Sequence, residues 1–348
     1  MKYNPALDGI RAIAILMVMG FHAMVPRTWG GYLGVDVFFV LSGFLITSLL
    51  LAETSRTGTI NLKKFYTRRF ARLTPPLIAM LLIYLLLARF AWPEILWRTD
   101  LRDALAALFY FADYTNAFWG FPVNLRHTWS LSVEEHFYIV WPTIVLLLLK
   151  LRTFKQRLLT LGVLYFVFTL WRVAWELLSG GHSYDLTYYR FDTRLSGLLI
   201  GALLAFLFHT DRERVLEKYV RPMALLPFIV LFLFVWRFTP GSTVAMTIGI
   251  TVVEAVSIIL IYCSMRLQSG LSFRLLSNPV TVFIGRMSYG LYLWHYPIFH
   301  FMWDRYKWYE TLLVGGGAAL LLAVLSYYTI ERFARERAGL ERKQLAAA

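Results

Sequence analysis

The chain is divided into about ten apolar segments, most of them close to 20 residues long, separated by short polar loops. They lie at 9–25, 34–52, 74–91, 133–150, 158–178, 194–210, 222–238, 245–264, 283–302 and 310–330. A helix needs about 20 apolar residues to cross about 30 Å of hydrocarbon. Backbone polar groups inside lipid must be paired within the segment, which favours helices. The sequence therefore predicts an all-α, polytopic membrane protein with about ten transmembrane helices.

The composition supports this class, because 58% of the residues are hydrophobic and only 16% are charged. A soluble domain seldom reaches that apolar content. The shorter segment 101–118 is amphipathic and is expected on the membrane surface or as a re-entrant element. The single cysteine, Cys263, allows no intrachain disulfide and no cysteine-based metal site, and no metal is expected.

The net charge of +14 would suggest a nucleic-acid partner in a soluble protein, but no nucleic-acid-binding motif is present. The basic residues fall instead in the loops between apolar segments. If the N-terminus is inside, 23 of the 35 Lys and Arg residues lie in inner loops and 8 lie in outer loops. This asymmetry follows the positive-inside rule and predicts that both termini are cytoplasmic.

The domain organisation is expected to be simple. Residues 1–331 are predicted to form one transmembrane domain, and residues 332–348 a basic cytoplasmic tail. Because so few residues follow the last apolar segment, no second soluble domain is expected.

Two ionisable side chains, Arg11 and His22, lie in the first apolar segment. A charged group at membrane depth is costly and usually faces a polar cavity or a partner. Eleven helical steps of about 100° bring the two side chains to within about 20° of the same direction, with Cα atoms about 16 Å apart along the axis. One helical face therefore presents a fixed cation at one depth and an imidazole at another.

The predicted topology places several polar residues in the same outer layer as His22. These are Asp36, Glu134, Glu135 and His295. A carboxylate beside a histidine orients the ring and stabilises the imidazolium form, so His22 is a candidate general base. The catalytic candidates are therefore His22, Asp36, Glu134 and Glu135.

A second group, of arginines, is predicted at the inner layer. Arg11 lies near the segment that holds Arg68, Arg69 and Arg72, and Arg69 and Arg72 share a helical face because they are three residues apart. Arginine forks suit bidentate phosphate binding. A ligand with phosphates at this layer and a reactive end about 16 Å deeper would fit. A coenzyme A thioester has this shape, so these four arginines are the cofactor-binding candidates.

Each group also has a structural interpretation. The arginines could serve only as positive-inside anchors, and the glutamates could stabilise the start of a helix. Arg172 and Glu176, four residues apart, are expected to form an ion pair. Asp192 and Arg194 could be a rim pair or could line a substrate entrance. A transporter or flippase of a glycan or lipid would also explain buried charges in ten spans.

Five motifs carry a resemblance to the membrane-bound acyltransferase-3 family. In chain order they are Leu7-Asp-Gly-Ile-Arg-Ala-Ile-Ala-Ile-Leu with its Arg11/His22 pair, Gly34-Val-Asp-Val-Phe-Phe-Val-Leu-Ser-Gly-Phe-Leu-Ile, Arg69-Phe-Ala-Arg72, Thr128-Trp-Ser-Leu-Ser-Val-Glu-Glu-His-Phe-Tyr and Ser288-Tyr-Gly-Leu-Tyr-Leu-Trp-His-Tyr-Pro-Ile. The resemblance implies ten core helices, an acyl-CoA donor bound from the cytoplasm and a catalytic histidine, His22. Family members often have Gln at the position of His136 in this chain, a change that could tune the acceptor site.

The resemblance and the residues together predict an O-acyltransferase of the bacterial inner membrane. It is expected to move an acetyl group from acetyl-CoA to a hydroxyl of a surface polysaccharide or its lipid-linked precursor, with a macrolide or similar glycosylated product as an alternative acceptor. The residues proposed for the acceptor are His295, Trp129, Asp192 and Arg194. His22 would deprotonate the acceptor hydroxyl or carry the acyl group transiently, and the sequence leaves both routes open. Family members with a fused periplasmic domain also exist, and this chain is expected to complete transfer alone or to pass the acyl group to another protein.

Overall fold

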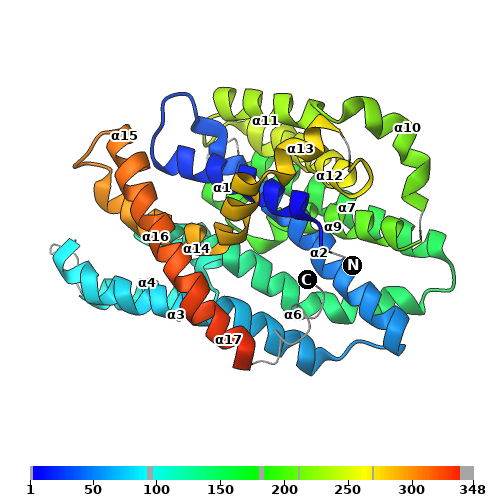
Figure 1. Cartoon of the computed structure of the whole chain (residues 1–348), viewed down its shortest axis with the longest axis horizontal. Helices are drawn as coiled ribbons and strands as arrows, with labels where there is room; N and C mark the ends of the chain where they lie inside the picture. The colour runs from blue at the N-terminus through cyan, green and yellow to red at the C-terminus, as the bar shows by residue number, and fades with distance from the viewer. Residues whose placement is uncertain (1–2, 92–96, 180–183, 211, 269, 338–348) are drawn as a thin grey trace.

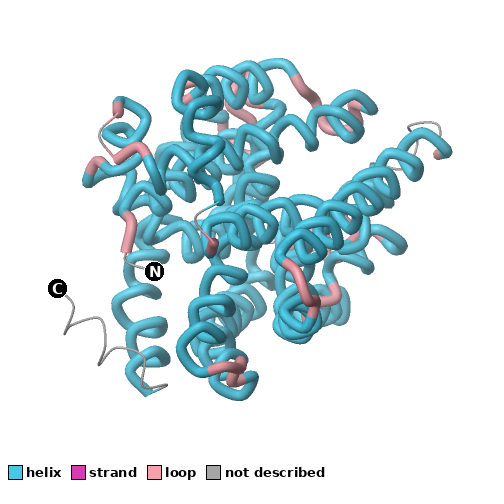
Figure 2. Tube along the Cα trace, turned by 90° about the vertical axis from the view of Figure 1, so that its right-hand side faces the viewer, coloured by secondary structure: helices cyan, strands magenta, loops and turns pink. Residues whose placement is uncertain are grey.

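The computed structural model describes residues 3–91, 97–179, 184–210, 212–268 and 270–337, and the regular structure in these ranges is helical, with no strand (Figure 2). The longer helices are α1 (Pro5–His22), α2 (Gly34–Thr57), α3 (Leu62–Ala91), α6 (Trp129–Lys150), α7 (Phe154–Leu178), α9 (Phe191–His209), α12 (Ile250–Arg266) and α14 (Pro279–Met302).

Shorter helices join and extend them. The α-helical ones are α4 (Trp97–Leu108), α5 (Ala112–Trp119), α8 (Tyr184–Tyr188), α10 (Glu217–Val220), α11 (Leu226–Arg237), α13 (Leu271–Ser277), α15 (Trp308–Glu310), α16 (Gly316–Ser326) and α17 (Arg332–Arg337). Single 3-10 or π-helical turns complete the order: η1 (Trp29–Leu33), η2 (Arg126–Thr128), η3 (Arg212–Leu216), η4 (Arg221–Met223), η5 (Ala245–Gly249), η6 (Thr311–Gly315) and η7 (Tyr327–Glu331).

The predicted all-α membrane class is confirmed. Within the described ranges, eight helical stretches are long and apolar enough to cross a bilayer, and a ninth appears if the bent pair Arg214–Met223 and Leu226–Arg237 counts as one span. The predicted segment 283–302 lies in α14, which has 24 residues but is not in that set. The chain is a multi-pass membrane protein.

Close packing of α2 against α9 forms the centre of the molecule (Figure 1). A side chain at Gly43 would place its Cβ 2.0 Å from the carbonyl oxygen of Leu198, and one at Gly201 would place it 2.0 Å from that of Val40. Small residues let membrane helices approach closely enough for dispersion contacts to hold them, because lipid offers no hydrophobic driving force. These two glycines therefore set the distance between the two helices.

Helix α1 is a continuous helix from Pro5 to His22 that packs against α14. The Asn4 side chain accepts a hydrogen bond from the amide of Ala6 at 3.0 Å, and Pro5 occupies the first turn, where no amide donor is needed. Because the helix has no break, Arg11 and His22 keep the predicted spacing of about 16 Å along the axis.

The predicted amphipathic segment 101–118 spans parts of two helices. Helix α4 ends at Leu108 and α5 begins at Ala112. Tyr110, between them, has a φ of 56°, in the left-handed region that interrupts a right-handed helix. Asp100 and Asp103 are buried against the rest of the protein, so α4 is anchored by its polar face.

The expected Arg172–Glu176 ion pair is wrong. Arg172 points to a different helix and pairs with Glu254 of α12 at 3.3 Å, while both Glu176 carboxylate oxygens are buried without a hydrogen-bond partner among the described residues. The spacing rule failed because α7 has few buried residues, and its inward face meets α9 and the η5 turn that leads into α12. Most of the predicted basic tail, from residue 338 onwards, lies outside the described residues.

Candidate active site

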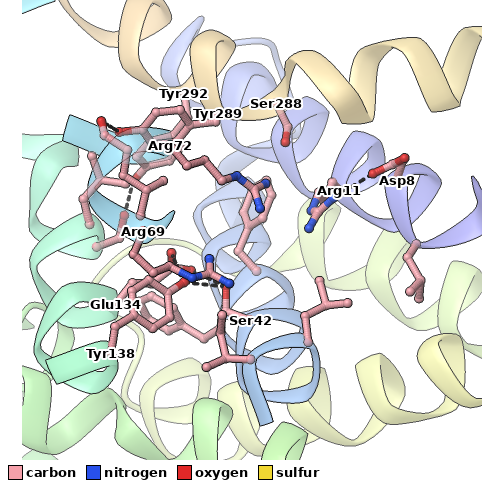
Figure 3. Close-up of a pocket in the computed structure, with 18 of the residues that line it drawn as sticks. Asp8, Arg11, Ser42, Arg69, Arg72, Glu134, Tyr138, Ser288, Tyr289 and Tyr292 are labelled. Carbon is pink, nitrogen blue, oxygen red and sulfur yellow. Dashed lines mark hydrogen bonds and ion pairs between the residues drawn. The ribbon is translucent and has the colours of Figure 1, made fainter. Parts of the chain in front are cut away.

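A cavity of about 350 Å³ lies where α1, α2, α3, α6 and α14 meet. Three arginines line it, and we call it the basic cavity (Figure 3). Its polar lining consists of Tyr3, Asn4, Asp8, Arg11, Ser42, Arg69, Arg72, Ser130, Glu134, Tyr138, Ser288, Tyr289 and Tyr292. Arg11 enters from α1, whereas Arg69 and Arg72 enter from one face of α3, as their spacing predicted.

Two of these arginines have no carboxylate partner. Neither Arg69 nor Arg72 forms an ion pair with any residue that the structure describes. The Arg69 guanidinium lies 5.0 Å from the centre of the Tyr138 ring and 5.9 Å from that of Phe65, so aromatic faces support it. Unpaired guanidinium groups in a partly enclosed cavity are a suitable arrangement for binding an anion such as a phosphate.

The carboxylates of the basic cavity are already engaged. Asp8 accepts a hydrogen bond from Arg11 at 2.7 Å. Glu134 accepts from the Ser42 hydroxyl at 2.7 Å and from the Tyr138 hydroxyl at 2.9 Å. Figure 3 shows Glu134 beside Tyr138 and Ser42, below the arginines, so this residue belongs to the basic cavity and not to a pair with His22.

A second cavity, of about 210 Å³, contains His22 and is called the histidine cavity here. It is lined mainly by aromatic side chains: Val18, Phe21, His22, Tyr32, Val35, Arg126, His127, Trp129, Tyr184, Tyr188, Tyr189, Pro240, Tyr292, Tyr296 and Trp303. Val35 and Tyr292 line both cavities. The two cavities are therefore neighbours along α1, with Arg11 in one and His22 in the other.

His22 is held by another histidine and not by a carboxylate. His22 Nδ1 lies 2.9 Å from His295 Nε2, and His295 Nδ1 lies 2.9 Å from the carbonyl oxygen of Leu291. A carbonyl oxygen can only accept, so His295 Nδ1 carries the hydrogen and its Nε2 accepts from His22 Nδ1 when both rings are neutral. This chain fixes the tautomer of His22 and leaves its Nε2 lone pair free for chemistry.

His127 is the third histidine of a group with His22 and His295, and the sequence analysis did not single it out. Its ring centre lies 5.7 Å from that of His295, and it stacks on Tyr296 at 4.8 Å. The side chain is buried, and neither ring nitrogen has a hydrogen-bond partner in the part of the chain that the structure describes. Its position directly before the Thr128-Trp-Ser motif is the signal that could have identified it.

Several tyrosines present their rings to the histidine cavity, because their hydroxyl groups are hydrogen-bonded to backbone carbonyl oxygens. The Tyr188 hydroxyl donates to the carbonyl oxygen of Tyr32 at 3.2 Å, and the Tyr32 hydroxyl donates to that of Thr239 at 3.3 Å. The Tyr292 hydroxyl donates to the carbonyl oxygen of His127 at 2.8 Å. The indole of Trp303 donates to the backbone oxygen of His22. The walls are thus rigid aromatic surfaces, which suit the flat, apolar faces of sugar rings.

Five of the other predicted site residues line neither cavity: Asp36, Arg68, Glu135, Asp192 and Arg194. Asp36 forms a buried ion pair with Arg194 at 2.5 Å, so it does not orient His22. Asp192 pairs with Arg190 and not with Arg194. Neither Glu135 nor Arg68 lines either cavity, and Arg68 is exposed. Of the acceptor candidates, Trp129 lines the histidine cavity and His295 contacts His22.

The guanidinium of Arg194 lies 4.7 to 5.9 Å from the ring centres of Tyr188, Trp129 and Phe39, so the Asp36–Arg194 pair supports the aromatic wall of the histidine cavity.

The sequence analysis assigned the wrong partners to the buried charged residues for one reason. A linear pattern predicts depth in the membrane but does not identify which helices become neighbours.

The unusual His136 pairs with Asp113 of α5, with Nδ1 and Oδ2 3.1 Å apart. Burial raises the pKa of the Asp113 carboxyl, and the hydrogen bond from His136 acts in the opposite direction. His136 lines neither cavity, so its contact is with α5 and not with the histidine cavity.

Comparisons with known proteins give a consistent result. A family model described as "Acyltransferase domain" matches residues 4–331. A Staphylococcus aureus (strain MSSA476) protein is 35% identical over 329 residues, which cover 88% of this chain and 52% of that protein. No solved structure matches the chain.

Two further relatives have informative names. The Listeria monocytogenes "Peptidoglycan O-acetyltransferase OatA" is 34% identical over 315 residues, covering 85% of this chain and 49% of its own. The Staphylococcus aureus (strain NCTC 8325) "O-acetyltransferase OatA" is 33% identical over 321 residues, covering 88% and 52%. The chain thus spans about half the length of the curated relatives it matches.

Proposed function

Because the chain belongs to the acyltransferase-3 family, we propose that it transfers an acetyl group from acetyl-CoA to a hydroxyl group of a cell-envelope glycan or its lipid-linked precursor. The observation that carries this proposal is the pair of adjoining cavities. One presents unpaired arginines, and the other presents a histidine with a free ring nitrogen. The names of the relatives support the choice of acetyl and of a glycan acceptor.

The donor would bind with its phosphates in the basic cavity. Arg69 and Arg72 form no ion pair within the described part of the chain and can offer bidentate hydrogen bonds to phosphate oxygens. Arg11 contributes a third positive charge, which Asp8 partly balances. The long, thin arm of coenzyme A would pass Val35 and Tyr292, the residues common to both cavities, and bring the thioester near His22.

His22 would act as the general base. Its Nε2 takes the proton from the acceptor hydroxyl as the oxygen attacks the thioester carbonyl carbon, and the C–S bond then breaks. The imidazolium returns the proton to the departing thiolate, so the balance closes with an acetyl ester and free coenzyme A. His295 shares the positive charge on His22 through the Nδ1–Nε2 hydrogen bond while the ring is protonated.

The location of the enzyme follows from the loop charges. Basic residues concentrate on the side of Arg69 and Arg72, which we place at the cytoplasm, where acetyl-CoA is made. The histidine cavity then lies toward the outer face of the bacterial inner membrane. This orientation puts donor and acceptor on opposite sides of the same catalytic histidine.

The test is His22→Ala in the full chain, reconstituted in lipid and assayed for acetyl-CoA-dependent acetylation of a glycan acceptor. We expect transfer to fall by about 10²–10⁴-fold, the usual contribution of a general base. His209→Ala is the matched control, because His209 lies at the exposed end of α9 and lines neither cavity. Undiminished transfer by His22→Ala would exclude the assignment.

Acetyl-CoA binding separates this proposal from the transporter alternative. A transporter of a glycan or lipid has no need for an acyl-CoA site. The acyltransferase should bind acetyl-CoA in the absence of acceptor, and Arg69→Ala should weaken that binding. Failure of the purified protein to bind acetyl-CoA would favour transport.

A further inference from the structure

The histidine cavity contains one permanently charged side chain. Arg126, in the η2 turn between α5 and α6, lines the cavity together with two histidines and the aromatic wall. Among the described residues that line the cavity, none is an aspartate or a glutamate. The cavity therefore presents a net positive charge to whatever occupies it, which an uncharged sugar does not require.

Arg126 is incompletely paired. Its Nε atom is buried without a hydrogen-bond partner, and it makes no ion pair within the described ranges. Its guanidinium shares a side-chain hydrogen bond with Tyr189, and Asp185 lies close enough to interact with its charge. Asp185 itself does not line the cavity, so it can balance part of the charge without filling the space in front of the guanidinium.

The geometry connects Arg126 to the reacting end. Tyr296 packs edge-on against the His22 ring at 4.8 Å and lines the histidine cavity together with Arg126. The cation and the catalytic histidine therefore line the same cavity as this tyrosine. A cavity of about 210 Å³ holds a unit of roughly one sugar ring, so a single residue of the acceptor can reach both groups.

A planar guanidinium selects oxyanions. Its fork of N–H donors matches the two oxygens of a carboxylate or two oxygens of a phosphate, and hydrogen bonds between charged groups are about twice as strong as neutral ones. A partly buried cation that is incompletely paired is costly, and an anionic ligand relieves this cost. Aromatic walls, one cation and no acids together describe a site for an anionic sugar.

We propose that the histidine cavity binds a glycosyl unit that carries a carboxylate or a phosphate ester, with the anionic group on Arg126 and a hydroxyl at His22. This proposal rests on the proposed function for the position of the hydroxyl, but the charge selectivity can be measured without any turnover. Arg126 is then the residue that determines which glycan residue is acetylated.

The experiment measures binding of three soluble probes to the full chain in lipid nanodiscs, followed by intrinsic tryptophan fluorescence, since Trp129 and Trp303 line the cavity. The probes are methyl glucoside, methyl glucuronide and glucose 6-phosphate. One or both anionic probes should bind at least about tenfold more tightly than the neutral one. The order of the two anionic probes distinguishes a sugar carboxylate from a phosphate as the natural group.

Three variants make the result specific. Arg126→Gln should remove the preference, and Arg126→Lys should keep part of it, because lysine retains the charge but not the fork. Unchanged acetyl-CoA binding by both variants would show that they are folded. His22→Ala should keep the preference for the anionic probes even though it abolishes transfer, so failure of the charge selectivity is distinguishable from failure of the proposed reaction.

Three outcomes would overturn the proposal. The first is equal affinity of the wild-type chain for neutral and anionic probes. The second is an anionic preference that survives Arg126→Gln. The third is no binding of any of the three probes, which would show that the histidine cavity does not accept a sugar unit of this size.

Discussion

Replacement of His295 separates two effects on His22: the fixing of its tautomer and the hydrogen bond to its protonated ring. Nε2 of His295 accepts from His22 Nδ1 at 2.9 Å, and Nδ1 of His295 is fixed by the Leu291 carbonyl. His295→Gln places an amide oxygen near the former Nε2 position, so it can still accept from His22 and preserve the tautomer. His295→Leu removes the acceptor altogether, so it also frees His22 to adopt the other tautomer.

The magnitude follows from the hydrogen bond. A hydrogen bond to a charged partner contributes about 1.5–3 kcal/mol, roughly twice one between neutral groups. Each 1.36 kcal/mol of barrier is a factor of ten in rate, so complete loss of the bond to the His22 imidazolium costs about 10–150-fold in kcat. His295→Gln, which keeps a neutral acceptor, should lose about tenfold or less. His295→Leu should lower kcat by at least about 10–150-fold, because part of the protein population would also hold His22 in the wrong tautomer.

The assay is acetyl transfer from acetyl-CoA to a glycan acceptor at saturating donor, with acetyl-CoA binding as the check that each variant is folded. Both variants should bind acetyl-CoA as the wild-type chain does, because His295 lies outside the basic cavity. Equal and complete inactivation by Gln and Leu would refute the tautomer argument. Full activity of His295→Leu would show that His22 needs no second histidine.

Two further predictions concern the donor site and the packing of the helices. Arg72→Gln should raise the KM for acetyl-CoA by about 10–150-fold, because phosphate hydrogen bonds are lost. Arg68→Gln, outside the basic cavity, should change this KM by less than about twofold. Equal effects of the two variants in titrations with acetyl-CoA would contradict a donor site in the basic cavity. Gly43→Ala should cost about 1–3 kcal/mol of stability, because its Cβ would lie 2.0 Å from the Leu198 carbonyl oxygen. Gly162→Ala, which meets nothing within 4 Å, should leave thermal unfolding in detergent unchanged, and a similar loss in both would argue against close α2–α9 packing.

The sequence predicted those parts of the fold that depend on local patterns. Apolar length alone placed the membrane helices, because the hydrocarbon thickness sets a minimum for every span. The three-residue spacing of Arg69 and Arg72 also correctly predicted that they share a helical face, since both residues lie on α3 and enter the basic cavity together.

The parts that failed depend on which helices become neighbours. Asp36 was expected beside His22 because both lie at the same predicted depth, but α2 packs on α9 and brings Asp36 to Arg194. His22 found His295 because α1 packs on α14. Depth along the membrane normal can be read from one chain, whereas the arrangement around it is decided by close contacts such as that at Gly43.

The most direct measurement is a cryo-EM structure of the chain in nanodiscs with a non-hydrolysable acetyl-CoA analogue. The account predicts phosphates within hydrogen-bond distance of Arg69 and Arg72, an arm that passes Val35 and Tyr292, and the acyl carbonyl beside Nε2 of His22. An analogue bound elsewhere, or one whose acyl group ends within the basic cavity away from His22, would contradict the two-cavity mechanism.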